Sequence, residues 1–440
     1  MEIKKGTFKK GIHPSYNKHY TSSLPIEIMP SPKEVAIPMS MHTGAPATPV
    51  VEVGQYVHLG ELIGQAAGYI SANIHASVSG TVKAIEPRLM GNGSKVSCVV
   101  IENDFQDAPC ENVEKHDPET VSPEEIVKII QNAGIVGEGG ATFPTSVKLS
   151  PGPDAKIDYV IINGAECEPY LTSDHAYMRE HADKVAGGLH LAMKVFGLEK
   201  GYIGIEDNKP DAIEAFKTLN DDSIIVYELE TKYPQGSEKH LISAIAGREV
   251  PSGGLPAQAG CIVINAGTAG AIYDAVTEGK PLYERVVTVT GSGIKQPRVL
   301  SFRIGTNVNE IIEYCGGLTD DIAKVILGGP MMGPAIYDPN VPAGKGTSGI
   351  LCLNRADAHI EDPSNCIRCA KCTEVCPMGL MPMYLGAFSQ KRNFEKCDEY
   401  NALDCIECGC CAFTCPARRP LVAEIRVAKR GVQALRKKRG

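Results

Sequence analysis

The stretch that decides the architecture is CIRCAKCTEVCP at residues 366–377, and its spacing recurs as CIECGCCAFTCP at residues 405–416. Both follow the pattern Cys-x2-Cys-x2-Cys-x3-Cys-Pro. The two-residue gaps let three thiolates converge on one face of an iron–sulfur cubane, while the fourth cysteine, beside a proline, is directed elsewhere. Tetrahedral zinc needs only two Cys-x2-Cys pairs, so the duplicated pattern favours two [4Fe–4S] clusters.

The same spacing predicts which thiols share a cluster. In two-cluster ferredoxins the fourth cysteine of each motif binds the other cluster. The expected ligands are Cys366, Cys369, Cys372 and Cys415 for one cluster, and Cys405, Cys408, Cys411 and Cys376 for the other. We expect Cys410 and Cys397 to be buried and to bind no metal. The sequence between the motifs has helical spacing, which predicts an α-helical 2×[4Fe–4S] ferredoxin domain over residues 355–416.

Composition limits the remaining possibilities. The chain has 440 residues, 43% of them hydrophobic, which is enough for several cores. A net charge of -8 argues against nucleic-acid binding. The N-terminus lacks an apolar signal segment, and no run of about 18 apolar residues occurs, so we expect neither secretion nor a membrane span. Clustered thiols in a reducing compartment are metal ligands more often than disulfides.

The N-terminal part predicts a small β unit. Residues 1–30 form a polar leader, and residues 31–105 alternate short apolar runs with glycine. VEVGQYVHLGELIG (51–64) and ANIHASVSGTVKAIE (72–86) resemble the two halves of a biotinyl/lipoyl-type barrel-sandwich hybrid. A carrier domain needs a hairpin lysine, and none occurs between Leu62 and Thr81. We therefore expect a docking or structural role.

The middle of the chain predicts an α/β domain over residues 120–283. Ser122 and Pro123 open a helix as N-cap and first residue. Helical stretches then alternate with apolar runs that are expected to be strands of a largely parallel sheet. Those runs are residues 159–163, 200–206, 223–229 and 261–267. A second small unit of strands and one helix follows at residues 284–335.

A glycine-rich loop, GIVGEGGATFPTSVK, occupies residues 134–148 of this domain. It follows a helix and not a strand, so it is not a Rossmann fingerprint, and it lacks the Lys-Ser/Thr of a P-loop. Gly137, Gly139 and Gly140 can still present bare backbone N–H groups to a phosphate or a flat ring, and Lys148 can neutralise phosphate charge. Taken alone, the segment could equally be an ordinary tight loop.

A resemblance favours the binding interpretation. The loop resembles the flavin- and NADH-binding loop of the complex I 51-kDa subunit family. The likeness continues in order through INGAECEPYLTSDHAYM (162–178), the stretch at 233–260 and INAG (264–267). Residues 284–335 resemble an SLBB β-grasp domain. With its leader and β unit, the chain is identified as a member of the C-subunit family of Rnf ion-translocating ferredoxin:NAD oxidoreductase complexes.

The resemblance implies non-covalent FMN, with NAD(H) as substrate, and hydride exchange followed by one-electron steps through two clusters. FMN carries the hydride, so no side chain is implied as catalytic. The implied contacts are Gly137, Gly139, Gly140 and Lys148 around FMN and its phosphate, Phe143 on the nucleotide's adenine, Asn163, Glu166 and Asn265 by the flavin, Glu168 by the nucleotide, and Glu238 by the nicotinamide. Glu138, Ala165 and Cys167 replace the complex I family's Arg, Asp and Ser. We expect Cys167 to be a tolerated small residue.

The resemblance also implies a setting. The chain would be peripheral, on the cytoplasmic face of the membrane, with the A, B, D, E and G subunits as partners, linked indirectly to ferredoxin and coupled to Na+ or H+ transport. Two alternatives stay open. One is a soluble flavoprotein of the cobalamin-reductase type, against which the leading β unit argues. The other is a non-enzymatic electron-conducting scaffold, against which the intact glycine-rich loop argues.

The C-terminal segment, residues 417–440, predicts a basic amphipathic tail. Nine Lys/Arg and one Glu give residues 416–440 a charge of +8, so the other residues together carry -16. An apolar stripe follows helical spacing through Val422, Ile425, Ala428, Val432 and Leu435. The stripe could pack against the protein or help the tail dock on an anionic membrane or on acidic subunits. The family's membrane location favours docking.

Overall fold

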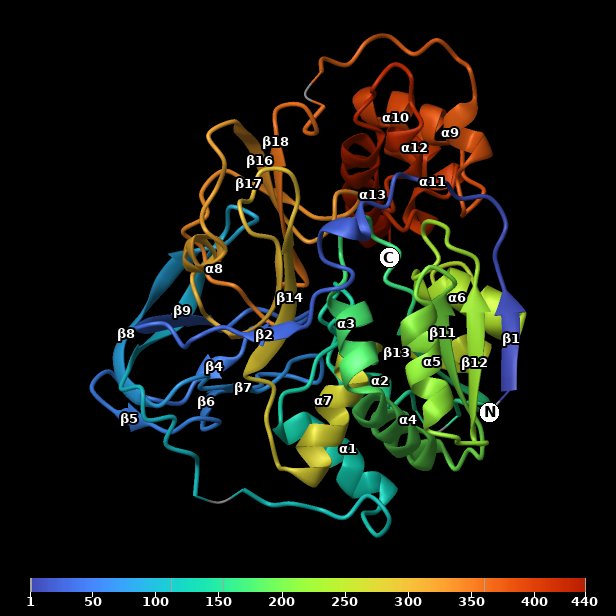
Figure 1. Ribbon diagram of the computed structural model, residues 1–440. Helices are drawn as coiled ribbons and strands as arrows, with labels where there is room; N and C mark the ends of the chain where they lie inside the picture. The colour runs from blue at the N-terminus through green and yellow to red at the C-terminus, as the bar shows by residue number, and fades with distance from the viewer. Residues whose placement is uncertain (1, 112, 153, 360, 440) are drawn as a thin grey trace.

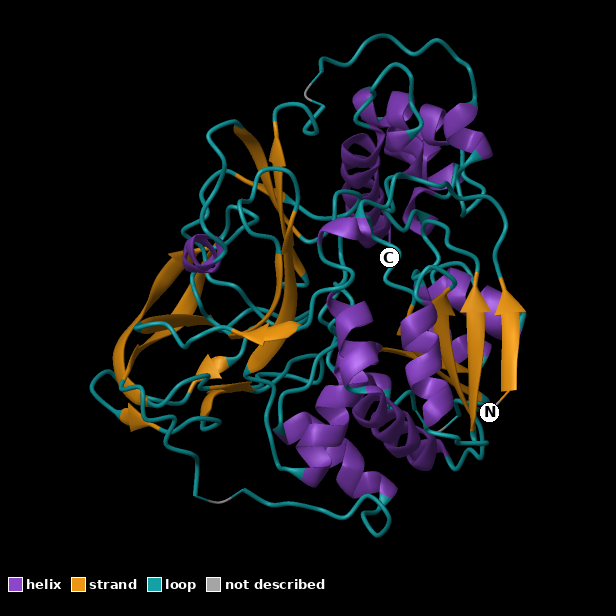
Figure 2. Ribbon diagram, viewed as in Figure 1, coloured by secondary structure: helices purple, strands orange, loops and turns teal. Residues whose placement is uncertain are grey.

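The computed structural model describes residues 2–111, 113–152, 154–359 and 361–439. Met1 and Gly440, the ends of the predicted leader and tail, lie outside the described residues. Two β-rich units lie on the left of Figure 1, an α/β unit at the lower right and a helical unit at the top right. Figure 2 shows the same division by secondary structure. The predicted multidomain α/β fold is confirmed.

The N-terminal β unit is built from two facing sheets. Side chains from both sheets, among them Ile37, Ile63 and Ile101, form one fully buried core. The four-stranded sheet has the order β3 (Glu34–Pro38), β9 (Lys95–Asn103), β8 (Gly80–Leu89) and β5 (Tyr56–Val57), and the three-stranded sheet has the order β4 (Thr48–Pro49), β6 (Leu62–Gln65) and β7 (Ile74–His75).

The α/β unit contains a five-stranded parallel sheet. Its order is β1 (Glu2–Gly6), β12 (Ile224–Leu229), β11 (Gly201–Glu206), β10 (Tyr159–Gly164) and β13 (Cys261–Asn265). The four predicted strands of this domain are all present. Its helices are α1 (Pro123–Asn132), α2 (Thr145–Lys148), α3 (Ser173–Glu180), α4 (Ala182–Phe196), α5 (Pro210–Thr218), α6 (Glu238–Ala246) and α7 (Ala266–Thr277).

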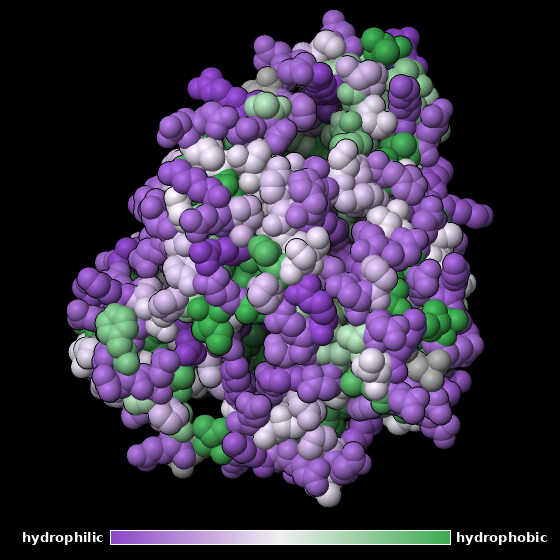
Figure 3. Space-filling model, in the orientation of Figure 1, coloured by the Kyte–Doolittle hydropathy of each residue, from purple (hydrophilic) through white to green (hydrophobic). Residues whose placement is uncertain are grey.

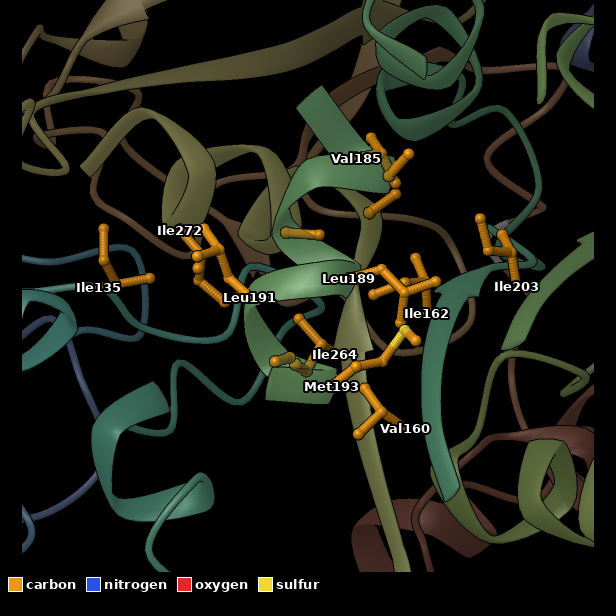
Figure 4. Close-up of a cluster of buried hydrophobic side chains, with 14 of the residues drawn as sticks. Ile135, Val160, Ile162, Val185, Leu189, Leu191, Met193, Ile203, Ile264 and Ile272 are labelled. Atoms are coloured by element: carbon orange, nitrogen blue, oxygen red, sulfur yellow. The ribbon is translucent and has the colours of Figure 1, made fainter. Parts of the chain in front are cut away.

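Both faces of this sheet are covered, which explains its continuous apolar strands. On one face Val160 and Ile162 of β10 pack with Leu189 of α4, as Figure 4 shows. On the other face Ile161 packs with Leu241 of α6. The strand period of two therefore sends alternate residues into two separate cores. The carboxyl edge of the sheet is left for the loops that carry the predicted site.

The helix before the glycine-rich loop begins where the sequence predicts. The Ser122 hydroxyl accepts a hydrogen bond from the Glu125 N–H at 3.3 Å, and the Glu125 carboxylate accepts one from the Ser122 N–H at 3.0 Å. This reciprocal capping box satisfies donors that the first helical turn leaves free. It fixes the start of α1, which leads directly into the loop.

The leader takes part in two sheets, which its polar composition does not reveal. β1 joins the edge of the α/β sheet in parallel with β12, and β2 (Ile26–Ile28) joins β15 (Arg298–Arg303). Between these strands the leader runs in Figure 1 as a blue segment between the helical unit and the α/β unit. A segment of about 30 residues thus links three of the four units.

The β-grasp unit extends beyond the predicted range in sequence. Its sheet has the order β17 (Ala335–Ile336), β16 (Ile322–Leu327), β18 (Gly349–Asn354), β14 (Glu284–Thr290), β15 and β2, with α8 (Val308–Tyr314) between β15 and β16. β18 lies after residue 335 yet occupies the middle of the sheet. Its residues Ile350, Leu351 and Cys352 are fully buried, which is why this apolar run forms a central strand.

The helical unit contains short helices around the cysteine motifs. They are α9 (Lys371–Glu374), α10 (Pro382–Gln390), α11 (Phe394–Glu399), α12 (Cys410–Phe413) and the longer α13 (Leu421–Arg439). Ile425, Ala428 and Val432 of α13 are buried in one cluster with Leu385 of α10 and Cys397 of α11. The apolar stripe of the tail therefore packs within this unit. It gives no support to docking of the tail on a membrane or on other subunits.

The charged residues of the tail also form contacts within the helical unit. Arg426 and Lys429 of α13 pair with Glu407 at 2.7 and 2.6 Å, and Arg436 pairs with Asp398 at 2.7 Å, so part of the tail's positive charge is neutralised internally. The face in Figure 3 is mainly hydrophilic, with apolar residues in small groups. Among the described residues, no helix combines the length and the apolar character that crossing a membrane requires.

Candidate functional site

Two cavities in the helical unit are lined by the cysteines of the two motifs. The first, here called the surface cavity, is lined by Cys366, Cys369, Cys372 and Cys415. The second, the interface cavity, is lined by Cys376, Cys405, Cys408 and Cys411. The four predicted ligands in each cavity are three thiols of one motif and one of the other, and Cys410 also lines the interface cavity. The geometry brings the eight cysteines together in the two sets that the spacing predicts.

The donor set fits iron–sulfur clusters. All eight cysteines are free thiols, and each cavity is lined otherwise mainly by apolar side chains such as Leu421 or Ile425. No group of three or more His, Cys, Asp or Glu side chains in the described part of the chain is arranged to hold a metal ion. A cubane binds each thiolate at a different iron, so its thiols are spread around a cavity. The cavities suit that arrangement.

The two other cysteines of this region are buried, as expected. Cys397 and Cys410 are both fully buried. Cys397 lies in the core with Leu385. Cys410 also lines the interface cavity and belongs to an apolar cluster with Ile12, Tyr233 and Cys167.

That cluster joins the interface cavity to the α/β unit. The Tyr233 hydroxyl donates a hydrogen bond to the Cys408 carbonyl at 2.7 Å, and Tyr233 is 1% exposed. The Gly236 N–H, three residues on, donates to the Cys167 sulfur at 3.2 Å. Burial raises the pKa of the Cys167 thiol far above its usual range, so this sulfur stays protonated and is not a nucleophile. The cysteine is a small packing residue, as the sequence suggested.

The glycine-rich loop folds back on itself above the carboxyl edge of the sheet. The Gly137 N–H donates to the Phe143 carbonyl at 2.8 Å, which closes the loop. At its tip Gly139 and Gly140 are exposed, and Gly140 has φ +116°, a conformation that L side chains rarely adopt. A Cβ added to Gly139 would lie 3.6 Å from the Cβ of Asn265. The loop therefore lies beside the end of β13, with Phe143 half-buried at its base.

Asn163 and Asn265 occupy paired positions at the carboxyl ends of neighbouring strands β10 and β13. The Asn163 side-chain amide donates to the Gly236 carbonyl at 2.7 Å. The Asn265 side chain caps α7 by accepting from the Gly267 N–H at 2.9 Å, and donates to Asp174 at 2.7 Å. Ligands of open α/β sheets bind in the crevice at this edge. Both asparagines therefore lie at this crevice.

Lys148 is predicted to contact the FMN phosphate and Glu238 the nicotinamide. In the structure these two side chains contact each other. The Lys148 ammonium lies 2.6 Å from the Glu238 carboxylate and donates to the Val263 carbonyl at 2.8 Å. Both side chains keep some exposure, 22% and 42%. The ammonium is thus held at the sheet edge by a partner that an incoming phosphate could replace.

Glu166 and Glu168 are occupied by backbone donors. The Glu166 carboxylate accepts from the Asp174 N–H at 2.8 Å and so caps α3. The Glu168 carboxylate accepts from the N–H groups of Met331 and Met332 at 3.1 and 2.9 Å, and burial raises its pKa to about 7. In this geometry both carboxylates hold protein segments together. Neither carboxylate is therefore free to contact the flavin or the nucleotide as the sequence predicts.

Two residues of the site have no signal in the sequence. The Arg285 guanidinium, from β14, donates to the Glu138 carbonyl at 2.6 Å and lies 3.3 Å from its carboxylate. Glu138 is buried, and burial raises its pKa. Asp174 is half-buried, and desolvation together with nearby Glu166 raises its pKa to about 7. The one hint in the sequence is Glu138, because a glutamate within the glycine-rich loop suggests a cationic partner such as Arg285 elsewhere in the chain.

Family models match four successive parts of the chain. Residues 6–106 match the RnfC barrel-sandwich hybrid domain and residues 130–274 the Nuo51 FMN-binding domain. Residues 286–335 match the SLBB domain and residues 358–416 a 4Fe–4S dicluster domain. The order of the four agrees with the units described above.

Curated relatives match over nearly the whole chain. The chain is 52% identical to the C subunit of the Na+-translocating ferredoxin:NAD+ oxidoreductase complex of Acetobacterium woodii, over 100% of both chains. It is 48% identical to the C subunit of the proton-translocating ferredoxin:NAD+ oxidoreductase complex of Clostridium ljungdahlii, over 96% of this chain and 93% of that protein. Identity to the C subunit of an ion-translocating oxidoreductase complex of Rhodobacter capsulatus is 43%, over 96% and 82%.

Proposed function

Because the chain belongs to the family of C subunits of ion-translocating ferredoxin:NAD oxidoreductase complexes, we propose how its two kinds of redox site work together. The chain has an FMN-binding domain and a [4Fe–4S] dicluster domain, and it serves electron transfer in such a complex. Bound FMN would supply hydride exchange with NAD(H) at the carboxyl edge of the α/β sheet. The cysteines of the interface cavity would hold the cluster that receives electrons first, and those of the surface cavity would hold the second cluster.

The contact of Tyr233 with Cys408 is the observation that carries this order. Tyr233 is buried between the α/β and helical units, and Gly236, which accepts from Asn163, follows three residues later. The flavin edge of the sheet and the interface cavity are therefore joined by one short segment. Cys366 and Cys369 of the surface cavity are exposed and make no such contact among the described residues. The surface cavity is thus the exit toward a partner.

The side chains of the sheet edge would hold FMN, and these roles are part of the proposal. The backbone of Gly137, Gly139 and Gly140 and the Lys148 ammonium would bind its phosphate and ring. Asn163 and Asn265 would border the flavin, and Phe143 the nucleotide. Bound FMN supplies the conversion between two-electron hydride chemistry and one-electron transfer. The protein orients the nicotinamide and keeps the redox groups close together.

Glu238 has a second role in this scheme. Its carboxylate holds the Lys148 ammonium at the sheet edge, at 2.6 Å, until phosphate takes its place. With phosphate bound to Lys148, Glu238 would be free for the nicotinamide end of the substrate. Glu166 and Glu168 act on FMN and nucleotide through the segments they hold, because their oxygens already accept backbone hydrogen bonds.

The setting of the chain within its complex is the last part of the proposal. We place it as a peripheral subunit on the cytoplasmic face of the membrane, with the A, B, D, E and G subunits as partners and ferredoxin as the indirect redox partner. The relatives that support this are named for different coupling ions, Na+ in Acetobacterium woodii and protons in Clostridium ljungdahlii.

Anaerobic purification of the full chain tests the proposal. We expect tightly bound FMN, about eight irons per chain and rapid bleaching of the flavin band by NADH. A chain with eight irons but no flavin, unchanged by NADH, would instead be an electron-conducting scaffold. Flavin that NADH bleaches without reduction of either cluster would contradict the proposed electron path.

A further inference from the structure

The ammonium of Lys18, in the leader, is buried against the loop that follows β10. It donates to the carbonyls of Glu166, Glu168 and Leu171 at 2.8, 3.1 and 2.5 Å. Burial lowers the pKa of Lys18, and the Glu166 carboxylate at 4.0 Å opposes that shift. A buried charge persists where hydrogen bonds satisfy it, and here all three donors are used.

A second buried lysine completes the arrangement. The Lys209 ammonium donates to the Ala165 carbonyl at 2.7 Å and lies 3.2 Å from the Glu206 carboxylate, with both side chains 0% exposed. The two lysines together hold four carbonyls within residues 165–171. Lys209 has a carboxylate partner nearby in sequence, whereas Lys18 comes from a segment about 150 residues away.

The loop needs such support because its backbone is strained. Glu166 and Tyr170 have φ of 44° and 70°, in the left-handed region that non-glycine residues avoid. In the same loop the carbonyls of Glu166, Glu168 and Leu171 all accept from the Lys18 ammonium. The leader adds a further tie, since the Tyr170 N–H donates to the Tyr16 carbonyl at 2.7 Å.

The loop positions groups on both sides of the proposed flavin site. It starts two residues after Asn163, and its Cys167 sulfur accepts the Gly236 N–H. Its Glu166 caps α3, whose Asp174 holds the Asn265 amide. A displaced loop would therefore move both asparagines at the sheet edge.

We propose that Lys18 is a positioning residue of the FMN site, supplied by the leader, which holds residues 165–171 in the conformation that flavin binding requires. The effect on FMN binding rests on the proposed function, whereas the support of the loop by Lys18 does not. Lys18 does not touch FMN in this role. It acts through the carbonyls of the loop.

The test compares Lys18→Met with two controls in the anaerobic full chain. Lys9→Met removes an exposed lysine of the same leader. Ile63→Ala opens a cavity in the core of the N-terminal β unit and lowers global stability away from the loop. We measure FMN affinity by flavin fluorescence, amide hydrogen exchange of residues 164–172, and iron per chain.

We expect Lys18→Met to weaken FMN binding at least tenfold and to speed exchange in residues 164–172, with iron unchanged. Lys9→Met and Ile63→Ala should keep wild-type FMN affinity, which separates positioning from a general loss of stability. Wild-type affinity and exchange in Lys18→Met overturn the inference. Should Lys18→Met not fold, Lys18→Gln is measured against the same criteria.

The two proposals fail in different ways. A wild-type chain that binds no FMN contradicts the proposed function. Exchange of residues 164–172 in Lys18→Met then still decides whether Lys18 holds the loop. A wild-type chain that binds FMN, with Lys18→Met equal to it, leaves the function intact and rejects the role of Lys18.

Discussion

The two thiol-lined cavities have the same cysteine spacing and different surroundings. In the surface cavity Cys366 and Cys369 are exposed and only Cys372 is buried, whereas in the interface cavity Cys376, Cys408 and Cys411 are buried. Solvent exposure and hydrogen bonds to the sulfurs set the reduction potential of such clusters. One duplicated motif therefore provides two different electron carriers, and the difference comes from what packs against each copy.

Removing one ligand from each cavity gives the largest expected difference. Cys408→Ala should remove the interface cluster and stop NADH from reducing the cluster that remains. Cys369→Ala should remove the surface cluster, while NADH still reduces the other. In both variants iron falls from about eight to about four per chain. Stopped-flow spectroscopy and electron paramagnetic resonance measure both effects, and the opposite pattern would reverse the proposed order.

The next effect concerns Glu168, whose backbone partner Met331 packs on the interface cavity beside Gly409. Burial raises the pKa of Glu168 from 4.5 to about 7, so the folded chain binds this proton more tightly than the unfolded chain. Stability from this group is present below about pH 4.5 and is lost as pH rises through about 7, by roughly 3 kcal/mol at most.

Denaturation at several pH values checks this expectation. Glu168→Gln should flatten the fall in stability between about pH 5 and 8 on the order of that amount. The exposed Glu111→Gln is the matched control and should keep the wild-type profile. A wild-type profile in Glu168→Gln would show that another group, such as Asp174, titrates there.

Lys148→Ala should weaken FMN binding and leave the clusters of both cavities unchanged. Loss of the ammonium that would meet the FMN phosphate is expected to weaken FMN binding about tenfold, which is about 1.4 kcal/mol. Iron content should stay at the wild-type value. Lys156→Ala is a control because that side chain is 90% exposed. Fluorescence titration with FMN gives the affinities, and equal values for both variants would exclude Lys148 from the site.

Tyr233→Phe should give the smallest effect and should be confined to the interface cavity. It removes the hydrogen bond to the Cys408 carbonyl and leaves that buried group unpaired, at a cost of about 1 kcal/mol. We expect lower thermal stability and a shift in the potential of one cluster in a redox titration. Tyr337→Phe, at an 80% exposed tyrosine, should change neither. A shift in both clusters would contradict the separation of the cavities.

Some parts of the site could be predicted because they depend on short spacing. Two residues between cysteines place three thiols within a short length of chain, whatever the rest of the protein does. The pairing of Asn163 with Asn265 follows similarly, since each ends an apolar strand of one parallel sheet. The role of Glu166 could not be predicted this way, because its carboxylate is used by the start of α3.

Residue types and their spacing were enough to identify the cysteine sets, the glycine-rich loop, the order of the four units and the family. These features depend on short separations along the chain, where covalent geometry limits the choices. The support of the loop after β10 by Lys18, the contact of Arg285 with Glu138, and the different exposure of the cysteines in the two cavities became visible only in the folded chain. Those contacts join residues far apart in the sequence, and the packing of whole units selects them.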